Sequence, residues 1–97
     1  MSNQVKIGPQ VFEIIVKPDL RRGDEGLDGW IQYHNSTISL DARLEEFAYK
    51  QVIWHEIVHG ILNNAGIKTV TEETVDALSY GILDVIQSNP WLTKEEK

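Results

Sequence analysis

The sequence predicts an α+β fold, in which a small, mainly antiparallel sheet of about three strands packs against two later helices. Three observations support this prediction. β-Branched residues and alternating polarity dominate the chain before residue 41, helix-forming residues with a helical apolar period dominate after it, and residues 18–29 are rich in glycine and charge. Because 97 residues leave room for one small core, we expect a single domain over residues 1–97.

The strand predictions rest on β-branched content and on turn residues. Residues 11–16 predict a strand, and we expect residues 5–7 to extend it beyond a Gly-Pro break. Residues 18–29 predict a loop, because they include three glycines and six charged residues. Residues 30–34 and 37–40 predict a β-hairpin around an Asn-Ser turn.

A long helix is predicted between residues 43 and 64. This stretch has no proline and no glycine before Gly60, and Asp41 precedes it as a predicted N-cap. At about 100° per residue, its apolar side chains fall into one stripe, made of Phe47, Trp54, Ile57, Val58, Ile61 and Leu62. We expect that stripe to face the core.

The second predicted helix begins after Thr71, its N-cap, and ends at Asn89-Pro90. Its apolar stripe consists of Val75, Leu78, Ile82, Val85 and Ile86. Beyond this helix we expect Trp91 and Leu92 to fold back on the core and residues 94–97 to form a solvated tail.

Composition and charge exclude several classes of protein. The net charge of −6 opposes binding to a phosphate backbone, so we expect no nucleic-acid partner. No apolar run approaches the length of a bilayer crossing, and the first residues lack the apolar stretch of a secretory signal. We therefore predict a cytoplasmic protein with no membrane partner. The absence of cysteine means that any zinc would be bound by histidine and carboxylate, as in catalytic zinc sites.

The segment His55-Glu56-Ile57-Val58-His59 has the pattern His-Glu-x-x-His, a zinc-binding signature of metallopeptidases. On a helix, His55 and His59 lie on one face, where both imidazoles can bind the same Zn²⁺. Glu56 beside them can accept a proton from a water whose pKa the cation has lowered. The three side chains lie away from the centre of the apolar stripe, so we expect them to face out of the core. Gly60 lies near this face, where it either keeps a cleft open or serves packing.

A catalytic zinc needs a third protein ligand, and Glu72 is the best candidate. It lies at the edge of the second apolar stripe, where it can point to the junction of the two helices. Glu73 and Asp76 are the alternatives for this position. Asp76 could instead accept a hydrogen bond from a ligating histidine. In a chain without His55 and His59, Glu72 and Glu73 would more commonly be explained by the favourable interaction of negative charge in the first helical turn with the helix dipole.

Together with Glu72-Glu73-Thr74-Val75-Asp76, the histidine motif resembles the gluzincin arrangement, in which a Glu-x-x-x-Asp on a later helix completes the site. The short chain is similar to minimal gluzincins and to small zinc peptidase-like proteins of phages and mobile elements, and this likeness covers most of it. The resemblance implies that His55, His59 and Glu72 bind zinc and that Glu56 is the general base and acid. It also implies that residues 37–40 form the edge along which an extended peptide lies.

The chain departs from related classes at several positions. Metzincins have Gly and His at the third and sixth positions after the motif, where this chain has Leu62 and Ala65, so that class is excluded. The Glu-Ala-Asn signature of the larger ImmA- and IrrE-like regulators is missing, which makes the likeness to them more distant. No residue obviously matches the transition-state-stabilising Tyr or His of larger members; the candidates are Tyr33, His34 and Tyr80.

These observations predict a zinc-dependent metallopeptidase, endopeptidase-like and either active or latent, that hydrolyses a peptide or protein substrate with Glu56 as general base. The alternative is a proteolytically inactive zinc-binding module of a phage or mobile element, which acts by protein contact. A third interpretation is a chance motif in ordinary helical packing, which predicts no stoichiometric metal.

Overall fold

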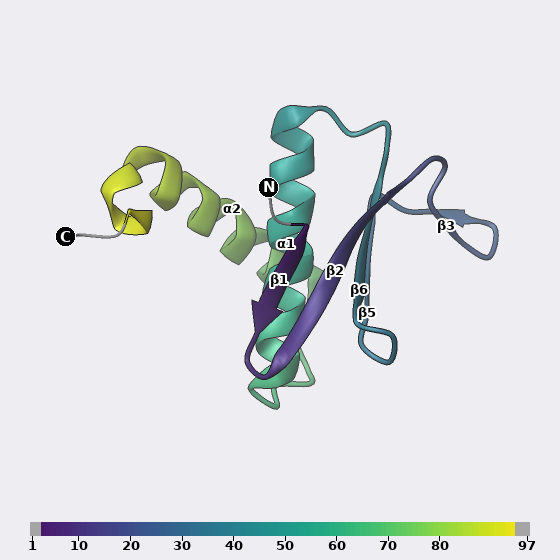
Figure 1. The fold of residues 1–97 in the computed structure, drawn as a ribbon. Helices are drawn as coiled ribbons and strands as arrows, with labels where there is room; N and C mark the ends of the chain where they lie inside the picture. The colour runs from purple at the N-terminus through teal and green to yellow at the C-terminus, as the bar shows by residue number, and fades with distance from the viewer. Residues whose placement is uncertain (1–2, 95–97) are drawn as a thin grey trace.

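A computed structural model describes residues 3–94, which form a four-stranded sheet, a small two-stranded ribbon and two long helices (Figure 1). The sheet has the strand order β1-β2-β6-β5, with β1 Gln4–Ile7, β2 Gln10–Lys17, β5 Gly29–Gln32 and β6 Thr37–Asp41. Its outer pairs, β1–β2 and β5–β6, are antiparallel, and its central pair, β2–β6, is parallel. The predicted α+β class with a mostly antiparallel sheet is therefore confirmed.

The N-terminal strand is one place where the sequence prediction is wrong. Instead of extending β2, β1 folds back on it as a hairpin, with Ile7 opposite Gln10. Gly8 makes this reversal possible because it has a φ of 58°, which costs a glycine little. The Gly-Pro break is a tight turn, and the sheet gains a fourth strand.

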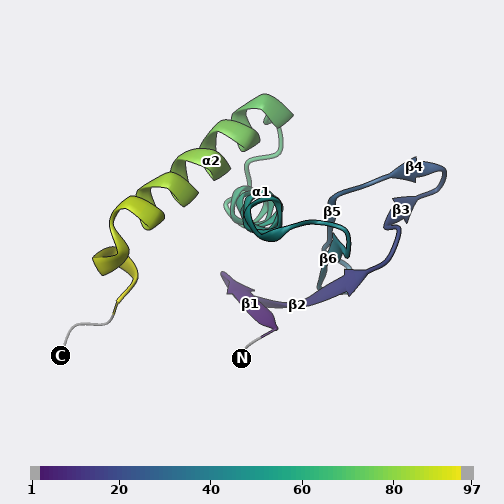
Figure 2. The same cartoon turned by 90° about the horizontal axis from the view of Figure 1, so that it is seen from above.

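The segment predicted as a loop contains regular structure of its own. The short strands β3 Arg21–Arg22 and β4 Glu25–Gly26 pair antiparallel and project away from the helices (Figures 1 and 2). Asp41 ties this segment to the domain, since its carboxylate accepts hydrogen bonds from the Leu20 amide at 3.0 Å and the Arg43 amide at 2.8 Å.

Asp41 is consequently not the N-cap that the sequence predicted. The first helix, α1 Glu46–Asn64, begins later, and its capping residue Glu45 makes no side-chain cap hydrogen bond. The second helix, α2 Glu72–Ser88, does have the predicted cap, because the Thr71 hydroxyl accepts a hydrogen bond from the Thr74 amide at 3.1 Å.

Helix α1 lies between the sheet and α2, as the view along α1 shows (Figure 2). The core forms between the sheet and α1, and its buried members are Ile7, Phe12, Ile31, Ile38 and Leu40. Gly60 belongs to this contact, because a Cβ there would lie 2.7 Å from Ile7 Cδ1 and 3.1 Å from Ile31 Cδ1. It is a packing glycine that lets α1 approach the strands.

This layered arrangement overturns part of both predicted apolar stripes. On α1, Phe47 and Ile61 are exposed, whereas the buried residues are Gln51, Glu56, Val58 and Gly60. On α2, Leu78 and Val85 are exposed, whereas the buried residues are Val75, Ser79 and Leu83. The reason is that α1 is covered on two sides, while α2 meets only α1 and the 3₁₀ helix η1 Pro90–Thr93 among the elements of residues 3–94.

The C-terminal part of α2 and the 3₁₀ helix η1 lead away from α1 (Figure 1). Trp91 and Leu92 lie in η1 and are exposed, so the prediction that they fold back on the core is wrong. Of the predicted solvated tail, Lys94 is exposed and residues 95–97 lie outside the described residues, as do residues 1–2. Within residues 3–94, no helix combines the length and apolarity needed to cross a membrane.

Candidate metal centre

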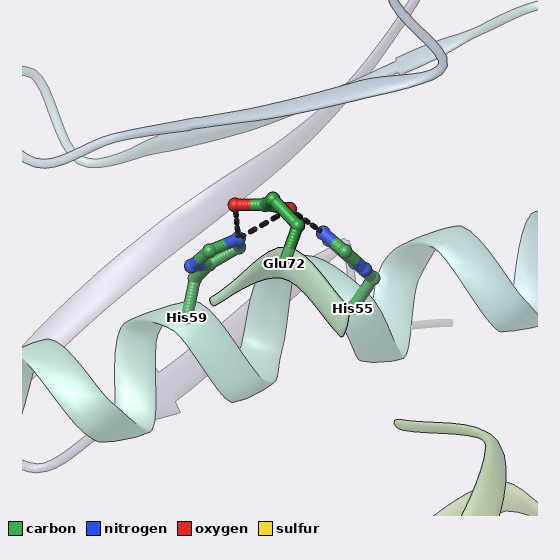
Figure 3. Close-up of side chains that lie close together, drawn as sticks. All are labelled: His55, His59 and Glu72. Carbon is green, nitrogen blue, oxygen red and sulfur yellow. Dashed lines mark hydrogen bonds and ion pairs between the residues drawn. The ribbon is translucent and has the colours of Figure 1, made fainter. Parts of the chain in front are cut away.

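His55, His59 and Glu72 meet where the middle of α1 faces the start of α2 (Figure 3). One helical turn separates the two histidines, and their ring centroids lie 4.9 Å apart. Glu72 Oε1 lies 3.0 Å from His55 Nε2, and Glu72 Oε2 lies 3.2 Å from His59 Nε2. The ligand atoms of all three residues fall within 4.8 Å of one another, so the group could hold a metal ion.

The donor set is one that zinc can use, and the histidine–carboxylate distances are near those of a tetrahedral site, although the whole group spans up to 4.8 Å. Two imidazole nitrogens and one carboxylate oxygen are a common set for catalytic zinc. Donor atoms about 2.0–2.2 Å from a tetrahedral ion lie roughly 3.3–3.6 Å from one another, and the histidine–Glu72 distances are 3.0–3.4 Å. Glu72 is exposed, so the group lies at the surface, where a fourth position would be open to a substrate.

The structure places the two alternatives for Glu72 differently. Asp76 lies on the opposite side of the His55 ring, with Oδ1 2.8 Å from Nδ1. An Nδ1–H that donates to this carboxylate leaves the Nε2 lone pair free for a metal and fixes the ring orientation. Glu73 is exposed and is not a member of the group formed by the described residues.

Glu56 does not face out of the core as predicted, since it is only 7% exposed. It lies against the edge strand β5: a Cβ on Gly29 would come within 3.2 Å of Glu56 Cγ and Oε2. Burial raises the pKa of the Glu56 carboxyl above its ordinary 4.5, while His55 and His59 act in the opposite direction. A carboxylate with a raised pKa is a stronger base, which suits a proton acceptor.

The peptide-binding edge predicted at residues 37–40 is wrong, because β6 pairs with β2 on one side and β5 on the other. The edge strands of the sheet are β1 and β5, and β5 is the one that lies beside Glu56. The Asp41 amide donates to the Asp28 carbonyl, so in this antiparallel register the main-chain groups of Gly29 and Ile31 point away from β6. They point to the edge beside Glu56, and a hydrogen bond from the Ile31 backbone helps to oppose the rise in the Glu56 pKa.

Two of the cavities that adjoin the histidine–carboxylate group are lined by Gly29, His55 and Glu56. One, of about 400 Å³, extends towards Tyr80, and the other, of about 550 Å³, towards Tyr33. Burial, followed by the charge of Glu56, raises the pKa of Tyr33 above 10.0. Of the candidates for stabilising a transition state, Tyr33 and Tyr80 therefore lie beside the site, whereas His34 lines neither cavity.

Sequence reasoning missed a buried polar link behind the site. Gln51 Nε2 donates to Ser79 Oγ at 2.9 Å, and Ser79 Oγ donates to the Asp76 carbonyl at 3.0 Å. This link joins α1 to α2 next to the His55–Asp76 contact. A signal was present, since Gln51 precedes His55 by four residues and so lies on the same face of a helix.

Comparisons of this chain with protein-family models, with curated proteins and with solved structures found no match.

Proposed function

We propose that this protein is a zinc-dependent metallopeptidase with a minimal zincin-like arrangement of sheet, motif helix and glutamate helix. His55, His59 and Glu72 would hold the zinc, and Glu56 would act as general base and acid. The observation that supports this most is the convergence of the three donor groups within 4.8 Å, with the Glu56 carboxylate on the adjoining residue of α1.

The residues of the chain have distinct roles in this proposal. When bound, the zinc ion would supply a Lewis acid and lower the pKa of water. Glu56, held in a buried position with a raised pKa, accepts the proton of the attacking water and returns it to the leaving amine. Asp76 keeps the His55 ring in the tautomer that leaves Nε2 unprotonated.

The substrate would be a peptide or protein segment in extended form. β5 offers the outward-facing main-chain groups of Gly29 and the Ile31 carbonyl next to Glu56, and strand addition there would bring a peptide carbonyl to the site. Tyr33, whose raised pKa keeps the phenol protonated, is the candidate donor to the oxyanion that develops.

Two variants, compared with wild type, test the metal site and the base separately. Wild type should bind about one zinc ion per chain by elemental analysis and calorimetry, and His59→Ala should abolish binding. Glu56→Gln should keep the zinc and lose peptide hydrolysis, measured by mass spectrometry of a peptide library. Zinc-loaded wild type that cleaves nothing, or cleaves no better than Glu56→Gln, would exclude the peptidase.

The third ligand has a matched control in the neighbouring residue. Glu72→Ala should weaken zinc binding strongly, whereas Glu73→Ala should leave it within about twofold of wild type, because Glu73 lies outside the donor group. Asp76→Asn should have an intermediate effect, typically about 10- to 100-fold. Equal losses at positions 72 and 73 would refute the assignment.

A second candidate function is an inactive zinc-binding module that acts by protein contact, as part of a phage or mobile element. The outer face of α2 favours it, because the exposed Leu78 and Val85 border an apolar groove there. The same peptide screen discriminates the two, since the module would bind zinc and cleave nothing.

A further inference from the structure

The cavity of about 400 Å³ beside His55 and Glu56 has an unusual combination of walls. Apolar carbon comes from Leu44 and Val52, and the charged groups besides Glu56 are the carboxylates of Asp28 and Asp76. No lysine or arginine of the described chain lines it. The nearby Arg43 is hydrogen-bonded to Asp41, through Nε at 3.0 Å and Nη2 at 2.9 Å, and it interacts with Asp28 only through its charge. The cavity therefore has a negative rim.

A second, independent feature is Gln51, which lines this cavity and is 8% exposed. Its Oε1 is buried and has no hydrogen-bond partner within residues 3–94. The amide orientation is fixed by its neighbours: Ser79 donates its only hydroxyl proton to the Asp76 carbonyl, so Ser79 Oγ needs a donor, which is Gln51 Nε2. The unpartnered group of Gln51 is thus an acceptor, and such a buried acceptor is costly without a donor.

Two aromatic rings complete the walls. Phe47 is 61% exposed and Tyr80 is 53% exposed, although both line the cavity. Exposed aromatic faces beside carboxylates attract a cation that sits over the ring, with a gain that increases when the cation is desolvated. An aliphatic stem would pack against Leu44 and Val52 at the same time.

We infer that this cavity selects a cationic side chain, arginine or lysine, next to the peptide bond that is cut. This inference rests on the proposed peptidase function and names its substrate class. The aliphatic stem contacts the apolar wall, and the charged end lies between Asp28 and the aromatic rings. One of its N–H groups donates to Gln51 Oε1 once the Gln51 side chain turns this buried oxygen towards the cavity. Neutral isosteres lose the charge, and acidic side chains are repelled.

The first experiment measures recognition without catalysis. Metal-free protein is titrated with n-butylguanidinium, which copies the arginine side chain, and with n-butylurea, its uncharged isostere, while NMR follows the Gln51 side-chain amide. We expect butylguanidinium to bind at least about tenfold more tightly and to shift the Gln51 signals. Equal affinities, or shifts confined to residues outside the cavity, would overturn the inference.

Charge variants locate the binding. Asp28→Asn should weaken butylguanidinium binding severalfold, because Asp28 lines the cavity. Asp84→Asn makes the same change in net charge on the exposed side of α2, away from the cavity, and should leave the affinity unchanged. Equal weakening by the two variants would show that only the overall charge attracts the probe, which overturns the inference.

The second experiment separates this inference from the proposed function. Zinc-loaded protein is given paired peptides that differ only by arginine or citrulline at one position, and cleavage is followed by mass spectrometry. Cleavage that is about tenfold faster beside arginine than beside citrulline supports both the peptidase function and the selectivity of the cavity. Cleavage without a preference, together with equal binding of the two probes, leaves a peptidase and removes the specificity. Selective binding of butylguanidinium with no cleavage of any peptide removes the peptidase and leaves a cation-selective cavity.

Discussion

Gly29 is the residue at which a single added methyl group would test both the packing and the proposed chemistry. A Cβ at this position would lie 2.5 Å from Val52 Cγ1 and 3.2 Å from Glu56 Oε2. Carbon atoms in contact ordinarily lie about 3.5–4.0 Å apart, so β5 and α1 would have to separate by roughly 1 Å. Gly29→Ala should therefore force both Val52 and Glu56 out of place.

The magnitude follows from two opposing effects. Overpacking of this kind costs about 1–3 kcal/mol of the free energy of unfolding. Replacing glycine lowers the entropy of the unfolded chain, which returns about 0.4–1 kcal/mol. The clash is larger, so we expect a net loss that lowers the melting temperature by several degrees, at about 4–8 °C per kcal/mol in a domain of this size.

The control is Gly26→Ala, because a Cβ at Gly26 would meet no atom within 4 Å. Urea unfolding of the metal-free proteins, followed by tryptophan fluorescence, should find Gly26→Ala within about 0.5 kcal/mol of wild type or slightly more stable. In the zinc-loaded proteins, Gly29→Ala should keep its zinc, since no donor residue is touched, and lose hydrolysis through displacement of Glu56. A Gly29→Ala protein as stable and as active as Gly26→Ala would refute the placement of Glu56 against β5.

Three further predictions concern other parts of the fold. Hydrogen bonds from Arg43 hold the pKa of the Asp41 carboxyl well below its ordinary 3.8. The ionised carboxylate therefore stabilises the folded protein above pH 3.8, and this stabilisation is lost as the pH falls below 3.8. Asp41→Asn should be less stable than wild type at pH 7, and urea titrations should find that the difference shrinks towards pH 2. Ser79→Ala should cost about 1–3 kcal/mol by leaving the buried Gln51 amide without a partner, and the double variant with Gln51→Leu should recover much of it. Gly81 lies in the interior of α2, and a Cβ added there would meet no atom within 4 Å. Gly81→Ala should therefore raise the free energy of unfolding by about 0.5–1 kcal/mol, measured by thermal scans. A destabilised variant would mean that this face of α2 is covered.

The local features of this chain could be predicted from its sequence. The helical period alone puts His55 and His59 on one face of α1. The Thr71 cap fixes the start of α2, which presents Glu72 and Asp76 one turn apart, and both lie beside His55 in the structure. These relations depend on residues close in sequence, so propensity, capping and period suffice to predict them.

Only the tertiary structure decided which side of each helix and strand is buried against its neighbours. β6 lies inside the sheet because it pairs in parallel with β2, a contact between segments more than 20 residues apart that no local pattern specifies. That pairing leaves β5 as an edge strand and places it over Glu56. A helical wheel assumes one buried side, but α1 has two, so Glu56 and Gln51 are buried while Phe47 is exposed. The motif thus determined which residues meet, whereas long-range strand pairing and helix packing determined the burial of the base and the cavities around it.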